Sequence, residues 1–288
     1  MRIPESELII NPDGSVFHLH IKPGELADKI ILVGDPGRVA TIANEFDRIE
    51  SEAENREFVS KTGYFNGKHI TVLSTGIGTD NIDIVLNELD ALVNIDFETR
   101  EINEKLKSLD IVRIGTSGGL HKDIPVDSIV MSERSIGFDG LLNFYEGRND
   151  VSDLDFENYL KDQLKWIPEL ASPYVVHASD KLIKRLDGSN IIKGATISAP
   201  GFYGPQGREL RLKTSNREIN SIIETFSYKG TIIANYEMES SAIAGLSGLL
   251  GHNAVTLCAI IANRVTKDYS KDYKIIIKEL IQHVLELI

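Results

Sequence analysis

Four short polar clusters in the 288-residue chain combine side chains that could bind a charged or strongly polar small molecule. They read GDPGR at 34–38, RIGTSGG at 113–119, SAPGFYGPQGREL at 198–210 and NYEMES at 235–240. Guanidinium and hydroxyl groups in the first two suit an oxyanion, whereas amide and carboxylate groups in the others suit donors and acceptors of a neutral ligand. The residue types therefore predict a site that binds both an oxyanion and a neutral polar group.

The first two clusters fit a phosphate. Gly34 and Arg38 follow an apolar run at a turn into a helix, where backbone N–H groups and a guanidinium favour an anion. Arg113 interrupts a second apolar run, three residues before Thr116, and needs a counter-charge if it points inward. A solvated Arg38 at a plain turn and an outward-facing Arg113 on an edge strand are the alternatives. Taken together, the two arginines and the Thr116 hydroxyl predict a phosphate site.

The third cluster is a loop rich in glycine and proline that contains Phe202, Gln206 and Arg208. An aromatic face with an amide and a guanidinium beside it suits a planar heterocycle that presents carbonyls and an N–H. An exposed turn without a ligand explains the same composition.

The fourth cluster places Glu237 and Glu239 where a strand gives way to a helix. Capping of that helix is one explanation, because the positive end of the helix dipole favours carboxylates. Carboxylates also accept hydrogen bonds from the vicinal hydroxyls of a sugar. The intervening Met238 could then pack against the apolar face of a ribose.

The segments between these clusters alternate between strand and helix patterns. Strands are predicted at 29–34, 109–119 (ending in a glycine turn), 127–140, 173–179, 190–198, 231–235 and 254–262, with a hairpin at 56–75 that turns at Asn66-Gly67. Helices are predicted at 81–93, 151–168, 179–186, 238–250 and at the C-terminus. This alternation predicts one α/β domain over residues 1–288, three layers deep, with a mixed central β-sheet flanked by helices. Ligands bind beyond the carboxyl ends of strands in such sheets, and the clusters fall there.

Composition narrows the class of protein. A formal net charge of −12 argues against a nucleic-acid surface, which needs clustered Lys and Arg. No apolar run is long enough to span a membrane, and MRIPESELII lacks the pattern of a secretory signal. With Cys258 as the single cysteine, no internal disulfide can form. These features predict a cytoplasmic protein.

No metal or organic cofactor is predicted. GTSGG at 115–119 lacks the helix that follows a nucleophile elbow, and GIGTDN at 76–81 lacks the third glycine of a dinucleotide motif. His18 and His20 share one side of an extended segment, but no acidic or Cys residue lies near them in the sequence to complete a metal site.

The clusters, in this order, resemble the nucleoside phosphorylase-I family and within it the uridine phosphorylases. The resemblance runs from about Val16 to the C-terminus and includes VFHL at 16–19, REF at 56–58, STGIG at 74–78 and NR at 263–264. It implies a pentosyltransferase that reversibly converts uridine and phosphate to uracil and ribose 1-phosphate. It also implies a homo-oligomer, a dimer or a hexamer of dimers, with shared active sites.

The same resemblance assigns roles to individual residues. Phosphate would be bound by Gly34, Arg38, Arg113 and Thr116, with Arg56 reaching in from a neighbouring subunit. Ribose would be bound by Glu237, Met238 and Glu239, with His18 from the neighbour. The base would be bound by Gly118, Phe202, Gln206, Arg208 and Arg264. Catalysis would rest on Glu239, Arg113 and Arg208.

Several alternatives remain open within this resemblance. Purine phosphorylases usually have an aspartate where this chain has Asn263-Arg264, which argues against purines but leaves thymidine and deoxyuridine as substrates. Many uridine phosphorylases read Phe-Tyr-Pro-Gly-Gln where this chain has Gly204-Pro205. Some members bind a monovalent cation at the dimer interface through a glutamate like Glu57, but Asn81 replaces the accompanying serine. A hydrolase and, from another class, a non-catalytic nucleoside-binding protein are the remaining alternatives.

Overall fold

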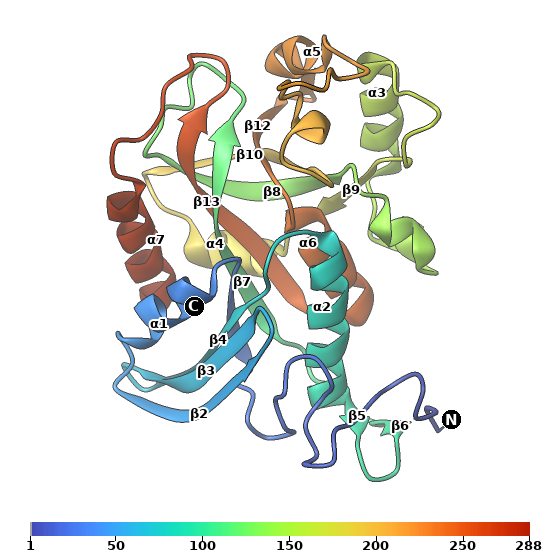
Figure 1. Cartoon of the computed structure of the whole chain (residues 1–288), viewed down its shortest axis with the longest axis vertical. Helices are drawn as coiled ribbons and strands as arrows, with labels where there is room; N and C mark the ends of the chain where they lie inside the picture. The colour runs from blue at the N-terminus through green and yellow to red at the C-terminus, as the bar shows by residue number, and fades with distance from the viewer. Residues whose placement is uncertain (1) are drawn as a thin grey trace.

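A long mixed β-sheet runs through the computed structural model, which describes residues 2–288 (Figure 1). Its strands lie in the order β11-β12-β10-β8-β13-β7-β1-β4-β3-β2, with β9 paired to β8. A small separate hairpin is formed by β5 (Ile95–Asp96) and β6 (Glu101–Ile102). The strands of the main sheet are β1 (Lys29–Val33), β2 (Arg48–Asn55), β3 (Phe58–Phe65), β4 (Lys68–Ser74), β7 (Asp110–Gly119), β8 (Ile129–Gly137), β9 (Tyr174–His177), β10 (Ile191–Ser198), β11 (Ser227–Tyr228), β12 (Thr231–Glu237) and β13 (Asn253–Asn263).

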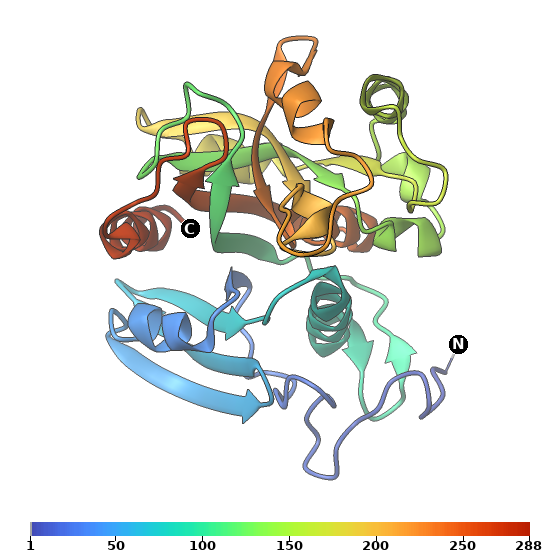
Figure 2. The same ribbon diagram turned by 45° about the horizontal axis from the view of Figure 1, so that its top comes forward.

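Helices cover both faces of this sheet and make the predicted three layers (Figures 1 and 2). One face packs against α1 (Pro36–Ala43), α4 (Asp180–Leu186) and α7 (Tyr273–Leu287). The other packs against α2 (Thr79–Asn94), α6 (Ser240–Leu250) and the N-terminal segment. A further apolar cluster joins α3 (Leu154–Leu164) and α5 (Ile219–Thr225) to β8, β10 and β12. The predicted α/β fold with a mixed sheet is confirmed.

The helix starts follow from short polar signals in the sequence. Asp35 accepts a hydrogen bond from the Gly37 N–H and precedes Pro36, whose fixed φ suits the first turn of α1. Asp153 accepts from the Phe156 N–H at α3, and Asp272 accepts from the Lys274 N–H at α7. These caps fix where each of the three helices begins, and Arg38 lies in the first turn of α1.

Strand β12 closes part of the sheet on itself. It pairs in parallel with β10 and, through Asn235 and Tyr236, antiparallel with Gly119 and Gly118 of β7. The path from β7 through β13, β8, β10 and β12 therefore returns to β7. This closure brings Glu237, the last residue of β12, and Glu239, at the start of α6, to the carboxyl end of β7.

The glycine turn predicted after Arg113 is wrong. Gly118 and Gly119 are part of β7, which continues to residue 119 because both glycines pair with β12. A side chain on Gly119 would lie 3.2 Å from Asn263 Nδ2 and 3.3 Å from the Ile124 carbonyl, so glycine permits close approach of neighbouring chain segments here.

The extended segment predicted for residues 17–21 is also wrong. Residues 17–19 form a turn, and His20 has a φ of 54°, so His18 and His20 do not lie on one side of a strand. The Val16 N–H donates to the Ile21 carbonyl and closes this turn. Among residues 2–288, no group of three or more His, Cys, Asp or Glu is placed to hold a metal ion. Over the same residues, no helix combines the length and the apolar character that a membrane crossing requires.

Candidate active site

A buried arginine between two buried glutamates forms the centre of the site. Arg113 extends from β7 and is 5% exposed, while Glu237 and Glu239 are 4% and 3% exposed. Arg113 Nη1 lies 3.1 Å from Glu237 Oε2, and Arg113 Nη2 forms an ion pair with Glu239 Oε2. The glutamates thus supply the counter-charge that an inward-facing Arg113 requires. Sequence positions more than a hundred residues apart meet here because β12 pairs with β7.

Glu237 is held by hydrogen bonds from several directions. Its carboxylate accepts bonds from the Glu239 N–H at 2.8 Å, the Ser240 N–H at 2.9 Å, the Ser240 hydroxyl at 2.8 Å and the Ser198 hydroxyl at 2.5 Å. Two of these donors are backbone groups at the start of α6, so Glu237 serves as the cap of that helix. Its lone pairs are largely occupied, which makes it a fixed support for Arg113.

Glu239 has fewer partners and a different environment. Besides Arg113, its carboxylate accepts a hydrogen bond from the Gly78 N–H at 2.8 Å. Gly78 has a φ of 103°, a conformation that favours glycine, so the turn after β4 can aim this N–H at the site. Glu239 therefore has spare acceptor capacity for hydroxyl groups of a ligand.

Electrostatics distinguish the members of this cluster. Burial raises the pKa of Glu239, the nearby Glu237 adds to the increase, and Arg113 only partly opposes it. Burial acts to lower the pKa of Arg113, but Glu239 and Glu237 outweigh it, so the guanidinium stays charged. Cys258 lies 3.5 Å from Arg113 Nη1, and burial raises the pKa of its thiol to about 12, so this sulfur is a neutral neighbour.

A second guanidinium faces the same region from α1. Arg38 Nη1 donates to the Ile114 carbonyl at 3.2 Å, one residue beyond Arg113 on β7. Burial and then the charge of Arg113 lower the pKa of Arg38, which reflects two cations brought close together. Gly34 lies at the end of β1, where a Cβ would be 3.3 Å from the Gly76 carbonyl, and Thr116 is half-buried on β7. Two neighbouring guanidiniums suit an oxyanion.

The loop between β10 and α5 brings three of the predicted base-binding residues together. Arg208 Nη1 donates to Gln206 Oε1 at 2.5 Å, and the Arg208 guanidinium lies 3.8 Å from the centre of the Phe202 ring. Burial and the nearby Arg264 lower the pKa of Arg208 to about 10. Arg264 Nη1 is buried and has no hydrogen-bond partner among residues 2–288. Two guanidiniums without a carboxylate at hand suit a ligand that offers carbonyl oxygens.

Two predicted residues lie apart from this centre. His18 contacts Glu88 and Asn55, and Arg56 occupies the exposed turn between β2 and β3 with a φ of 55°. Within the described residues, no hydrogen bond or ion pair joins either of them to Arg113 or Glu239.

Asn263, at the end of β13, is committed to the local backbone. Its Nδ2 donates to the carbonyls of His121 and Ile124, and its Oδ1 accepts from the N–H groups of Val265 and Thr266. With both ends of the amide used, Asn263 is a structural residue. Its role is to hold the turn that carries Arg264.

The possible cation ligand Glu57 is already paired. Asn81 Nδ2 donates to Glu57 Oε1 at 3.1 Å, so an amide N–H, which cannot ligate a cation, faces this carboxylate oxygen. In this arrangement the two side chains are hydrogen-bonded to each other, and no step of the chemistry is assigned to a cation.

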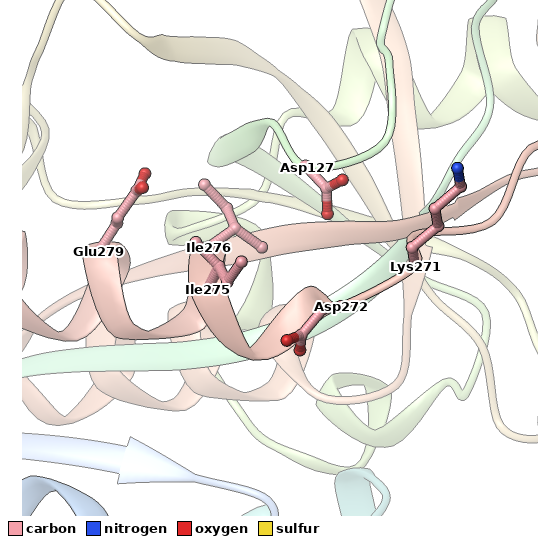
Figure 3. A pocket seen from close by; sticks show the side chains of 6 residues that line it. All are labelled: Asp127, Lys271, Asp272, Ile275, Ile276 and Glu279. Atoms are coloured by element: carbon pink, nitrogen blue, oxygen red, sulfur yellow. The ribbon is translucent and has the colours of Figure 1, made fainter.

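Two open hollows lie elsewhere on the surface of the described residues. One, of about 290 Å³, is lined by three carboxylates, one lysine and two isoleucines (Figure 3): Asp127, Asp272, Glu279, Lys271, Ile275 and Ile276. The other, of about 420 Å³, is lined by His121, Lys122, Glu224, Thr225, Phe226, Ser227 and Ile232. The first is too acidic for a phosphate, and neither includes a predicted site residue. The chemistry of the Arg113 cluster therefore decides the location of the candidate site.

Three contributing residues carried no assigned role in the sequence. Ser198 links Glu237 to the start of α6, because its Oγ also accepts from the Ser241 N–H at 2.8 Å. Asn220 supports the base loop by donating to the Gln206 carbonyl at 3.2 Å. Gly78 aims its N–H at Glu239. Ser198 begins the third polar cluster and Gly78 ends the STGIG motif, whereas Asn220 lies in neither, and each contact depends on tertiary structure.

Comparison with known proteins defines the class. Residues 28–288 match the model of the phosphorylase superfamily, and the chain belongs to that family. A Trypanosoma brucei nucleoside phosphorylase, described by its crystal structure as showing uridine phosphorylase activity, superimposes with a TM-score of 0.88 at 30% identity, covering 97% of this chain and 98% of that one.

The curated relatives include both uridine phosphorylases and purine nucleoside phosphorylases. A uridine phosphorylase of Thermococcus kodakarensis is 26% identical over 265 residues, covering 90% of this chain and 81% of that protein. A DeoD-type purine nucleoside phosphorylase of Streptococcus suis is 27% identical over 248 residues, covering 85% of each. The family is thus established, and the choice of base depends on the residues of this chain.

Proposed function

We propose that the protein is a uridine phosphorylase, a pentosyltransferase that reversibly converts uridine and phosphate to uracil and ribose 1-phosphate. The observation that carries the proposal is the arrangement of Arg113 between Glu237 and Glu239, with Arg38 beside it. It combines an oxyanion site with a carboxylate that has free capacity for sugar hydroxyls. The family and two of the three named relatives, from Trypanosoma brucei and Thermococcus kodakarensis, support the same activity.

In the proposed reaction, a phosphate oxygen attacks C1′ of the ribose and the C1′–N1 bond breaks. Arg38, Arg113 and Thr116 hold the phosphate, which lowers the entropic part of the barrier. Glu239 accepts hydrogen bonds from the 2′- and 3′-hydroxyls, and its negative charge stabilises the positive charge that develops on the sugar. Met238, half-buried between the two glutamates, packs against the ribose.

Uracil leaves with the bonding electron pair and gains a proton, and the hydrogen phosphate that attacks C1′ gives one up, so the overall reaction neither consumes nor releases a proton. Gln206, Arg208 and Arg264 donate to the carbonyl oxygens of uracil and stabilise the departing anion, beside Phe202 and Gly118. A purine would need a proton donor at N7, and the residue at the relevant strand end, Asn263, already uses its amide in the backbone contacts described above. This observation supports a pyrimidine over a purine.

Three further parts belong to the proposal. His18 and Arg56 reach the site of a neighbouring copy, so the protein is a homo-oligomer, a dimer or a hexamer of dimers. No metal or organic cofactor takes part. The location is cytoplasmic, which the single free cysteine, Cys258, supports.

The test is a base-release assay with purified protein. Uridine, thymidine, 2′-deoxyuridine and inosine are each incubated with and without phosphate. We expect phosphate-dependent release that is fastest for uridine. Release without phosphate would identify a hydrolase, faster cleavage of inosine would identify a purine enzyme, and binding without release of base would identify a non-catalytic nucleoside-binding protein. Any of these outcomes contradicts the proposal.

A further inference from the structure

Asn220 of α5 connects the loop between β10 and α5 to strand β12. Its Nδ2 donates to the Gln206 carbonyl at 3.2 Å, and its Oδ1 accepts the Tyr236 hydroxyl at 3.2 Å. The partners fix the orientation of the amide, because a backbone carbonyl can only accept and must face the NH2 end. One side chain therefore bridges a residue of the loop and a residue of the sheet.

The loop packs closely around this amide. Gly207, the residue after Gln206, has a φ of 68°, and a Cβ there would collide with Asn220 Nδ2. The Arg208 N–H donates to the Tyr203 carbonyl at 2.9 Å and closes the loop on itself. Glycine at 207 thus lets Asn220 reach the loop backbone, and a change in the position of Asn220 is passed on to Gln206 and Arg208 together.

The other end of the bridge lies within the strands of the candidate site. Tyr236 is 1% exposed, pairs with Gly118 of β7 and directly precedes Glu237. Burial raises the pKa of its phenol, so the hydroxyl stays protonated and can donate to Asn220. The hydrogen bond therefore refers the position of the loop to the strand that leads into the two glutamates.

We propose that Asn220 is a positioning residue whose bridge to Tyr236 sets the spacing between the base-binding loop and the ribose-binding glutamate, Glu239. This inference rests on the proposed function. Protein groups engage both ends of the Asn220 amide, so it acts through Gln206 and not by touching the substrate. A nucleoside joins base and ribose by one bond and must meet both parts of the site at once, whereas free uracil can follow a displaced loop.

The binding test compares uridine with free uracil by calorimetry in the absence of phosphate. We expect Asn220→Ala to raise the Kd of uridine by about tenfold, the worth of one hydrogen bond, and to change the Kd of uracil by less than about twofold. Tyr236→Phe removes only the hydroxyl and keeps the buried ring, and it should raise the Kd of uridine by about three- to fivefold with the same indifference to uracil. This second variant decides the question even if Asn220→Ala does not fold.

Asn216→Ala is the matched control. Asn216 lies just before α5, and its Oδ1 accepts the Glu218 N–H at 3.1 Å. Its loss removes an amide and loosens the start of α5 without touching the bridge, so uridine and uracil binding should both stay close to the wild type.

The kinetic test measures kcat/KM for uridine and the KM for phosphate. Asn220→Ala and Tyr236→Phe should each lower kcat/KM for uridine and leave the KM for phosphate within about twofold, because neither residue contacts Arg38 or Arg113 among the printed hydrogen bonds of residues 2–288. Adding Tyr236→Phe to Asn220→Ala should cause no further loss, because both changes remove the same hydrogen bond.

Two results would overturn the inference alone. Equal weakening of uridine and uracil binding in Asn220→Ala would show that the residue only stabilises the loop, and wild-type uridine binding in both variants would show that the bridge positions nothing. Failure of the proposed function gives a different pattern, because it is seen before any variant is compared. A wild type that cleaves no nucleoside, or that cleaves inosine faster than uridine, overturns both proposals.

Discussion

Substitution of Gly115 by alanine should displace Arg113 without removing any functional group. Gly115 lies two residues beyond Arg113 on β7, and an alanine Cβ there would be 2.9 Å from Arg113 Cζ and 2.8 Å from Cys258 Sγ. Atoms essentially never come this close, so the guanidinium or the strand must move. Arg113 cannot move freely, because Glu237 and Glu239 hold it from the other side. The φ of Gly115 is not positive, so the conflict is one of space alone.

The size of the effect follows from this geometry. Overpacking of a buried site costs about 1–3 kcal/mol. At about 2–4 °C per kcal/mol for a domain of this size class, Tm should fall by roughly 2–12 °C. A shift of the guanidinium by about 1 Å should lower kcat/KM for phosphate by about a hundredfold.

The assay measures uridine phosphorolysis at saturating uridine and varied phosphate, with thermal denaturation in parallel. Gly118→Ala on the same strand is the comparison, because its Cβ would make an ordinary contact, 3.7 Å from the Arg264 side chain. We expect Gly118→Ala to alter the KM for uridine and to leave phosphate kinetics nearly unchanged. Wild-type phosphate kinetics in Gly115→Ala would refute the role assigned to Arg113.

Three further predictions concern the same site. Glu239→Gln should lower kcat for uridine by about a hundredfold, because one charge-stabilising interaction is lost. The loss of kcat should be smaller for 2′-deoxyuridine, which has one hydroxyl fewer for Glu239 to bind. Equal losses on both substrates would contradict hydroxyl binding by Glu239. Arg208→Ala should raise the KM for uridine far more than the KM for phosphate. Wild-type activity should also decline as the pH rises through about 10, because the lowered pKa of Arg208 lets its guanidinium lose its charge there. A pH profile of activity that stays flat to higher pH, or that declines equally in Arg208→Ala, would contradict this assignment. Ser198→Ala should lower the free energy of unfolding by about 1–3 kcal/mol, measured by urea denaturation. The reason is that the buried Glu237 carboxylate and the Ser241 N–H each lose a hydrogen-bond partner. Unchanged stability would show that these two hydrogen bonds contribute little.

The sequence predicted the elements well because their signals are local. Apolar periodicity located β1, α2 and α7, and Asn66-Gly67 marked the hairpin between β3 and β4, where both residues have positive φ. The β2 strand was missed because half of its sequence, RIESEAEN, is charged, and its pairing with β3 makes it a strand.

The geometry of the site could be predicted from the sequence only in part. The sequence supplied Arg113, Glu237 and Glu239, but not the pairing of β12 with β7 that joins them, because strand pairing over such separations leaves no local pattern. Capping and ligand binding were alternatives for the glutamates, and the contacts assign capping to Glu237 while leaving Glu239 with acceptor capacity. The glycines after Arg113 suggested a turn, whereas they permit close strand contact.

Because the site is divided between sheet and loop, its base preference could change without a change in its oxyanion site. Arg113, Glu237 and Gly118 belong to strands that are pinned on both sides, so alterations there disturb the core. Gln206 and Arg208 belong to a surface connection whose anchors in the sheet are the end of β10 and the start of β11. That connection can be exchanged as a module. Grafting it from a relative with another base preference should transfer part of that preference while the oxyanion chemistry is inherited intact.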